Sequence, residues 1–183
     1  MDDKGRLFIA ADLPENIKKD LSALAAGLRR SIPGNYSREI NYHITLAFLG
    51  DTKLALTAKI REIILNAARG AAAFEVALSE LGFFGRESNA VLWCGIKGAQ
   101  PLYGIAEKIR DGLENAEVSF DPKPMKPHIT LARKAKLDGV NLKQMHVPNT
   151  VGMLTGISLY LSYRVNGELT YSPITRPIVL GKH

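Results

Sequence analysis

The chain has 183 residues, of which 46% are hydrophobic, so it can bury an ordinary globular core as one domain or two small lobes. Its formal net charge of +6 favours an anionic partner such as RNA or a phosphate ester. No apolar run approaches the length of a membrane span, and the first residues do not resemble a signal peptide. The single cysteine, Cys94, excludes an intrachain disulfide, so we expect a cytosolic protein that does not act at a membrane.

The first half of the chain alternates apolar strands with amphipathic helices. Pro14 suits the first turn of a helix, and Asp12 lies close enough before it to be a possible cap. Gly50 and Asp51 predict the end of the second strand, and Gly70 predicts the stop of the second helix. From these signals we predict strands over 6–13 and 42–49 and helices over 14–28 and 54–69.

The second half contains more strands than helices. Asn166-Gly167 is the strongest short turn signal in the chain and predicts a β-hairpin between the strands on either side. This half shows strand patterns over 74–81, 90–96, 125–133, 157–165, 169–174 and 177–180, a helix over 101–113, a turn over 85–89 and a polar loop over 137–150. Since helices and hairpins mix, the sequence predicts an α+β fold with largely antiparallel sheets.

The tetrapeptide His-Ile-Thr-Leu occurs twice, at 43–46 and at 128–131, and alanine follows each copy. The copies lie about half a chain length apart, and a predicted helix precedes each of them. An internal duplication explains both observations. We therefore expect residues 1–183 to form a single domain with two pseudo-symmetric lobes around a central cleft that carries both motifs.

The chemistry of the repeat depends on which way its side chains point. In a strand, His43 and Thr45 share one face, about 7 Å apart along the strand, and the same holds for His128 and Thr130. Histidine can exchange a proton near neutral pH, and threonine can donate a hydrogen bond to an oxyanion. An exposed strand face needs polar residues without any function. However, amphipathicity fixes only the pattern and not the residue types, so two identical copies favour a site for acid–base chemistry on a phosphate.

Several residues near the motifs are weaker candidates. Arg133 suits phosphate, because a guanidinium matches phosphate geometry. Arg133 is five residues after His128, and in a regular strand an odd spacing places two side chains on opposite faces. Arg133 can therefore reach the cleft only if the strand ends or bulges near Ala132. Trp93 and Tyr160 could line a base-stacking surface, although core packing is their default role. Basic residues flank the second copy, which is also typical of a solvated surface: Lys123, Lys126, Arg133, Lys134 and Lys136.

Other catalytic classes fit the sequence poorly. Zinc sites use three or four ligands, and neither motif contains a carboxylate or a second histidine. The remaining histidines are His146, in the predicted loop, and His183, the last residue. The chain has no Gly-x-Ser-x-Gly elbow of a serine hydrolase. We therefore expect no metal and no other cofactor.

The two motifs resemble the paired His-x-Thr signatures of the two-histidine (2H) phosphoesterases. The nearest branch is the LigT-like group of RNA 2′,3′-cyclic phosphodiesterases, also called 2′-5′ RNA ligases. The resemblance covers nearly the whole chain, and its main segments are His43-Ile-Thr-Leu-Ala-Phe-Leu-Gly50, Pro127-His-Ile-Thr-Leu-Ala-Arg133, Arg6-Leu-Phe-Ile-Ala-Ala-Asp-Leu-Pro14, Val91-Leu-Trp-Cys-Gly-Ile96 and Leu159-Tyr-Leu-Ser162.

This resemblance implies a phosphoric diester hydrolase that opens 2′,3′-cyclic phosphate RNA ends to 2′-phosphates without a metal. It implies that His43 is the proton donor, that His128 is the proton acceptor, and that Thr45 and Thr130 bind the phosphate. Arg133 is our addition to the phosphate ligands. The expected partner is RNA or a nucleotide with a 2′,3′-cyclic phosphate, bound by a monomer.

Two alternatives stay open at this stage. The first is a 2′-5′ RNA ligase, which runs the same chemistry backwards with a ribose hydroxyl in place of water. The second is a module that only binds RNA ends. A binding module is expected to carry many stacking aromatics, whereas aromatic residues make up only 7% of this chain.

Overall fold

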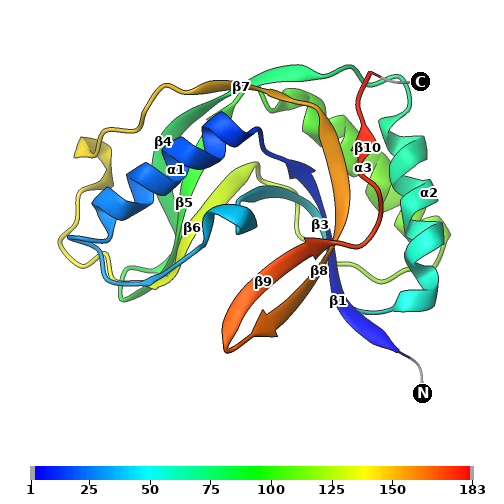
Figure 1. The fold of residues 1–183 in the computed structure, drawn as a ribbon, viewed down its shortest axis with the longest axis horizontal. Helices are drawn as coiled ribbons and strands as arrows, with labels where there is room; N and C mark the ends of the chain where they lie inside the picture. Colours follow the sequence, from blue (N-terminus) through cyan, green and yellow to red (C-terminus); the bar gives the residue numbers. More distant parts are fainter. Residues whose placement is uncertain (1–2, 182–183) are drawn as a thin grey trace.

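The computed structural model describes residues 3–181, which form two five-stranded antiparallel sheets and three α-helices (Figure 1). The first sheet contains β1 (Lys4–Asp12), β3 (His43–Lys53), β8 (Gly156–Val165), β9 (Glu168–Pro173) and β10 (Ile178–Val179). The second sheet contains β2 (Asn35–Tyr36), β4 (Phe74–Arg86), β5 (Asn89–Lys97), β6 (His128–Ala135) and β7 (Val151–Leu154). The helices are α1 (Glu15–Leu28), α2 (Thr57–Ala68) and α3 (Gln100–Asn115), with 3₁₀ turns η1 (Glu39–Asn41), η2 (Leu54–Leu56) and η3 (Leu142–Gln144). No helix of this described range is long and apolar enough to cross a membrane.

The two sheets meet along the strands that carry the repeated motif. The strand order is β10-β8-β1-β3 in the first sheet, with β9 beside β8, and β2-β6-β5-β4-β7 in the second. Strand β3 is therefore an edge strand. Strand β6 is covered by the short β2 only at Ala132 and Arg133, so its first half is free to face β3. Strands β3 and β6 are in contact, and this contact places the two motifs on either side of one cleft.

The helices cross between the two halves of the fold. Helix α1 follows β1 of the first sheet but lies against the second sheet, where the Asn16 side chain donates to the Val151 carbonyl of β7 at 2.7 Å. Helix α3 follows β5 of the second sheet but packs against α2 and β3 of the first. Figure 1 shows this exchange, with α1 over β4 and β5 and with α2 and α3 at the opposite end.

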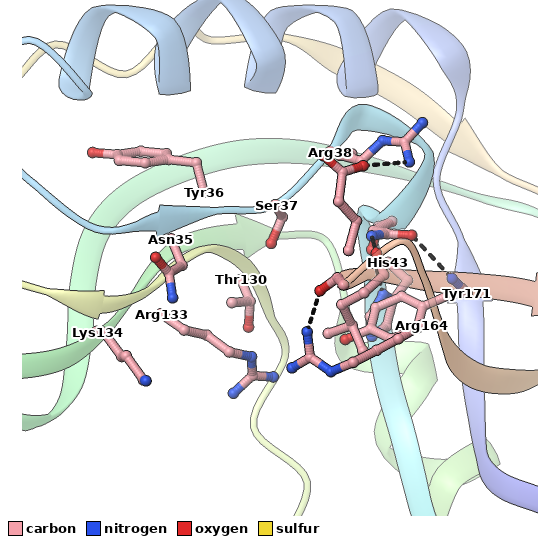
Figure 2. A pocket seen from close by; sticks show the side chains of 14 residues that line it. Asn35, Tyr36, Ser37, Arg38, His43, Thr130, Arg133, Lys134, Arg164 and Tyr171 are labelled. Carbon is pink, nitrogen blue, oxygen red and sulfur yellow. Dashed lines mark hydrogen bonds and ion pairs between the residues drawn. The ribbon is translucent and has the colours of Figure 1, made fainter.

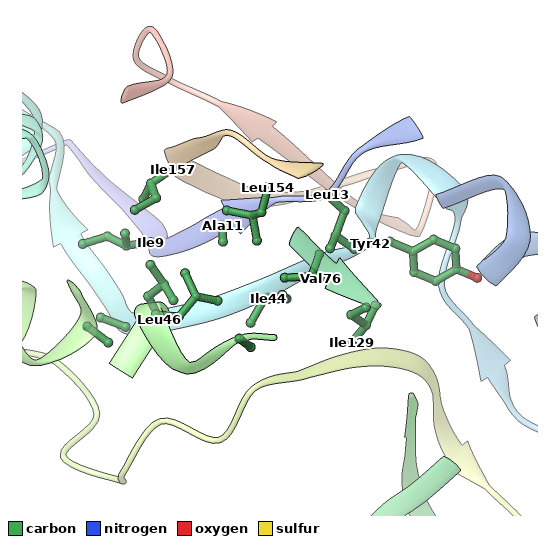
Figure 3. Close-up of a cluster of buried hydrophobic side chains, with 14 of the residues drawn as sticks. Ile9, Ala11, Leu13, Tyr42, Ile44, Leu46, Val76, Ile129, Leu154 and Ile157 are labelled. Carbon is green, nitrogen blue, oxygen red and sulfur yellow. The ribbon is translucent and has the colours of Figure 1, made fainter. Parts of the chain in front are cut away.

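The apolar residues of both motifs anchor the site in one continuous core. Ile44 and Ile129 are completely buried, and both belong to the cluster of side chains between the sheets (Figure 3). Burying an isoleucine or leucine side chain contributes roughly 1.5–3 kcal/mol relative to leaving it exposed. Since the apolar residues point into this core, the alternating histidine and threonine of each motif point to the other face, as predicted.

The predicted α+β class and the predicted helices are confirmed. The hairpin across the Asn-Gly turn is also confirmed, because Asn166 and Gly167 have φ values of 50° and 82°, the left-handed values that a two-residue hairpin turn requires. The turn predicted over 85–89 is shorter, since β4 continues to Arg86 and β5 begins at Asn89.

The predicted end of the second strand at Gly50-Asp51 is wrong. Strand β3 continues to Lys53, and Gly50 adopts a φ of +66° where the pairing with β1 shifts by one residue. Glycine reaches this conformation at little cost, so here it accommodates a β-bulge and does not end the strand.

The predicted cap at Asp12 is also wrong. Pro14 is the residue before the first turn of α1, and no side chain caps that end of the helix. The Asp12 carboxylate instead accepts hydrogen bonds from the Ser158 hydroxyl at 2.7 Å and the Tyr160 hydroxyl at 2.6 Å. Asp12 therefore links β1 to β8 beneath the site.

Candidate active site

The repeated sequence motif is also a repeated backbone irregularity. In β3, Thr45 and Ala47 face consecutive residues of β1, so the leucine between them is an extra residue. In β6, Thr130 and Ala132 face consecutive residues of β5, so the corresponding leucine is again extra. A bulge of this kind reverses the in–out alternation of the residues that follow it.

The bulge in β6 brings Arg133 to the cleft. Leu131 and Ala132 are buried in succession, so Arg133 is exposed on the side of Thr130 despite its odd offset from His128. A bulge near Ala132 was the predicted condition for this placement, and the structure meets it. Arg133 and Thr130 line the same cavity (Figure 2).

The same bulge in β3 brings Phe48 to the cleft, at the position that Arg133 occupies in the second copy. Phe48 is half-buried and lines a cavity together with His43 and Thr45. The Arg6 guanidinium lies over its ring at 5.0 Å from the centroid. Phe48 was not among the residues predicted from the sequence, although the repeat itself places it in register with Arg133.

Both histidines are held in one tautomer by the same local contact. The Nδ1 atom of His43 lies 2.7 Å from the carbonyl oxygen of Asn41, and that of His128 lies 2.6 Å from the carbonyl oxygen of Lys126. A carbonyl can only accept, so Nδ1 carries the hydrogen and donates in both cases. The proton that is gained and lost is therefore the one on Nε2. In His43 this nitrogen lies 3.0 Å from the hydroxyl oxygen of Thr45.

Aromatic rings surround His43 and lower its proton affinity. Its ring centroid lies 4.8 Å from that of Phe8 and 5.3 Å from that of Tyr171. The pKa of His43 is lowered to about 4, mainly by burial; the hydrogen bond to Asn41 opposes this shift, and the charges of His128 and Arg133 add to it.

His128 has a similar but more open environment. Its ring contacts Phe84 edge-on at a centroid distance of 4.9 Å and Trp93 at 6.3 Å. Burial lowers the pKa of His128 as well, and the neighbouring Lys126 charge acts in the same direction. Trp93 is buried, so it packs around a histidine and does not form an open stacking surface.

Tyr160 also has a packing role, which is the default role predicted for it from the sequence. Its ring stacks on Phe8 at 5.2 Å, and its hydroxyl donates to Asp12. The buried Cys94 thiol has a pKa raised to about 12 by burial, which agrees with its predicted place in the core.

A buried asparagine fastens the β8–β9 hairpin to the segment that holds His43. The Asn41 side chain donates to the Leu169 carbonyl at 2.8 Å and accepts from the Tyr171 backbone N–H at 3.1 Å. Its own carbonyl holds His43 Nδ1. Asn41 was not predicted from the sequence. The sequence shows only that Asn41 lies two residues before His43, and this position alone does not predict its contacts with β9.

Four of the five predicted site residues line one cleft, which is formed by two adjoining cavities of about 540 and 450 Å³. Thr130 lines the first cavity and Thr45 lines the second. His128 lines neither, but it shares a face of β6 with Thr130, and its charge lowers the pKa of His43. The residues common to both cavities are His43, Arg133, Arg164, Leu169 and Tyr171.

Of the two remaining histidines, only His146 belongs to the described residues. His146 is exposed on the loop after η3 and lines neither cavity. His183 lies outside the described residues. Within residues 3–181, no three or more His, Cys, Asp or Glu side chains are grouped so that they could hold a metal ion.

Paired histidines with matching tautomers, set on matching bulged strands, agree with the site that the sequence resemblance to the two-histidine phosphoesterases implies. The family model described as the 2′-5′ RNA ligase superfamily matches residues 13–148. The chain therefore belongs to this superfamily.

Curated relatives extend the match over most of the chain. A Geobacillus stearothermophilus protein named RNA 2′,3′-cyclic phosphodiesterase is 32% identical over 91% of this chain, which spans only about half of that relative, 54% of its length. An Escherichia coli K12 protein of the same name is 29% identical over 96% of this chain and 97% of its own length.

Solved structures share the fold. The crystal structure of E. coli LigT complexed with 3′-AMP has a TM-score of 0.80 and 24% identity, and covers 98% of this chain and 100% of its own. A crystal structure from Thermus thermophilus has a TM-score of 0.78 and 26% identity, and covers 97% of this chain and 100% of its own.

Proposed function

We propose that this chain hydrolyses RNA 2′,3′-cyclic phosphodiester ends to 2′-phosphomonoesters, with His43 as the proton donor and His128 as the proton acceptor. The observation that carries the proposal is the matched pair of histidines, each with Nδ1 held by a backbone carbonyl and Nε2 left to exchange a proton. The name RNA 2′,3′-cyclic phosphodiesterase, which several relatives share, supports the same substrate.

The reaction needs one base and one acid. His128 Nε2 takes a proton from water, and the water oxygen forms a new bond to phosphorus. The bond between phosphorus and the ribose 3′-oxygen breaks, and His43 Nε2 gives its proton to that oxygen. The product carries the phosphate on the 2′-oxygen, and the two histidines finish in exchanged protonation states.

The pKa values bear on this assignment. His43 has a pKa of about 4, so it is neutral in the free protein at neutral pH. As an acid it must gain a proton when the anionic substrate binds, because a nearby negative charge raises the pKa of an imidazole. The phosphate would sit between the two lobes, next to Nε2 of each ring, where this effect is strongest.

The phosphate oxygens need hydrogen-bond donors as negative charge develops. We assign this role to the Thr45 and Thr130 hydroxyls and to the Arg133 guanidinium. In the free protein the Thr45 hydroxyl is bonded to His43 Nε2, so substrate has to compete for that contact. Thr130 and Arg133 line the first cavity together.

The direct test is to incubate the protein with an oligonucleotide that ends in a 2′,3′-cyclic phosphate and to identify the product by phosphorus NMR. We expect a 2′-phosphomonoester. A longer strand with a 2′-5′ linkage would favour the ligase alternative, although hydrolysis should dominate in water. Tight binding without any turnover would favour a module that binds RNA ends.

The pH dependence should show two coupled histidines with lowered pKa values. For the free enzyme, kcat/KM should be bell-shaped with its optimum below the unperturbed histidine value of about 6.5, because burial lowers both pKa values. The optimum of kcat should lie at higher pH, since the bound anion raises both. The two limbs belong to the pair and not to named residues. A flat profile with chemistry shown to be rate-limiting would contradict the mechanism.

Activity should survive metal removal. No group of potential ligands for a metal occurs within residues 3–181, and the proposed acid and base are both imidazoles. We expect full turnover after exhaustive dialysis against EDTA, measured with the same substrate. Loss of activity that a divalent ion restores would instead identify a metal-dependent enzyme.

The monomeric state, the cytosolic location and the single domain over residues 1–183 stay predictions. The contact between β3 and β6 supports one domain, because the proposed site needs residues of both sheets.

A further inference from the structure

The β8–β9 hairpin presents one arginine, Arg164, to the cleft. The hairpin turn places the Gly167 carbonyl so that it accepts a hydrogen bond from the Arg164 guanidinium at 2.6 Å. Asn166 and Gly167 provide the left-handed backbone that this tight turn needs. The contact uses one nitrogen of the guanidinium, so its other N–H groups are available to a ligand.

Side chains of the segment before β3 hold the β8–β9 hairpin in place. The Asn41 side chain bonds the backbone of β9 at Leu169 and Tyr171. The Arg38 guanidinium pairs with the Glu168 carboxylate at 3.1 Å. These contacts hold the hairpin that carries Arg164 in a fixed position.

Arg164 faces Arg133 across the cleft. Figure 2 shows the two guanidinium groups directed toward one another from opposite lobes, and both residues line both cavities. Like charges in this arrangement repel each other, and anionic groups that enter the cleft relieve the repulsion. Among the described residues that line the two cavities, the only carboxylate is that of Glu168, which already pairs with Arg38. The cleft therefore carries positive charge that its own side chains do not balance.

The cleft has room for more than the reacting phosphate. The first cavity, about 540 Å³, continues past His43 to Asn35 and Lys134, so its far end is also basic. Arg133 follows the motif strand and shares a face with Thr130, which suits it to the reacting phosphate. Arg164 belongs to β8, in the other sheet. It is therefore placed to bind a second phosphate group of the same ligand while Arg133 binds the first.

We propose that Arg164 binds a second substrate phosphate, the phosphodiester that joins the terminal nucleotide to the rest of an RNA strand, and so gives the protein a preference for RNA ends over free cyclic mononucleotides. The inference rests on the proposed function and names its substrate class. A guanidinium is suited to this role because it can donate two parallel hydrogen bonds to one phosphodiester.

The test compares two substrates, adenosine 2′,3′-cyclic monophosphate and a triadenylate that ends in the same cyclic phosphate. Wild-type protein should show a higher kcat/KM for the triadenylate, by about tenfold or more, the usual effect of one charged hydrogen bond. Arg164→Gln should remove this preference, because it lowers kcat/KM for the triadenylate by about tenfold more than it lowers kcat/KM for the mononucleotide. Arg176→Gln is the matched control, because Arg176 is exposed and lines neither cavity.

Salt gives an independent readout. For a single strand, each phosphate contact contributes a slope of about −0.7 to the logarithm of affinity against the logarithm of salt concentration. Arg164→Gln should reduce the salt slope for the triadenylate by about 0.7, and Arg176→Gln should not change it.

The possible failures can be told apart. If wild-type protein hydrolyses both substrates equally well, or if Arg164→Gln changes neither rate, the second phosphate site is wrong while the proposed function stands. If Arg164→Gln lowers both rates equally, Arg164 binds the reacting phosphate and the inference is again overturned. If wild-type protein hydrolyses neither substrate, the proposed function fails and the inference fails with it.

Discussion

Replacing His43 or His128 with alanine should lower kcat by about 10² or more, the usual cost of losing a general acid or base. Each replacement removes one of the two Nε2 atoms that exchange a proton, and the third described histidine, His146, is exposed and lines neither cavity. The measurement is turnover of the cyclic-phosphate oligonucleotide, with circular dichroism to show that the fold is intact.

The double replacement gives the sharper result. Because the acid and the base act as one unit, the double variant should be little slower than either single variant. His146→Ala is the matched control and should keep wild-type turnover, since His146 is exposed on a loop outside the cleft. Near-full activity in either single active-site variant, with an unchanged fold, would end the two-histidine mechanism.

Replacing Arg133 with glutamine should lower kcat by about 10², the lower end of the range for losing one preorganised donor to a developing oxyanion. The bulge at Leu131 and Ala132 directs Arg133 to the side of Thr130, where the reacting phosphate would lie. The loss should appear in single-turnover kinetics, which isolate the chemical step from product release.

The control for Arg133 lies on the same segment. Lys136→Gln removes one exposed positive charge just after β6, at a residue that lines neither cavity, and should leave kcat unchanged. If both variants slow the enzyme equally, the basic segment attracts the substrate only through its overall charge. Such a result would remove Arg133 from the phosphate site.

Much of the architecture could be predicted because it follows from local patterns. Apolar residues at helical spacing marked all three α-helices, and Asn166-Gly167 marked the hairpin because few residues tolerate its backbone. The repeated motif placed His43 and His128 on one face of each strand through simple alternation. These features depend on neighbours in sequence, so one chain suffices to reveal them.

The features that escaped prediction depend on neighbours in space. The two-residue strand β2 and the four-residue β7 are too short to show a period of their own, and they exist because they pair with β6 and β4. Asp12 suited a helix cap locally, but Ser158 and Tyr160, far along the chain, offered its carboxylate better partners. The contacts of Asn41 with the β8–β9 hairpin also join distant segments.

The exchange of helices between the halves has a consequence for how the molecule is built. If an ancestral half-length chain gave rise to both repeats, that half could not cover its own sheet with the helix that follows its first strand, because α1 and α3 each lie on the opposite sheet. In a pair of such copies, each helix could pack against the sheet that holds the first strand of the other copy. Fusion of such a swapped pair would turn an assembly of two chains into one, remove its dependence on concentration, and fix the two histidines at opposite sides of the former interface.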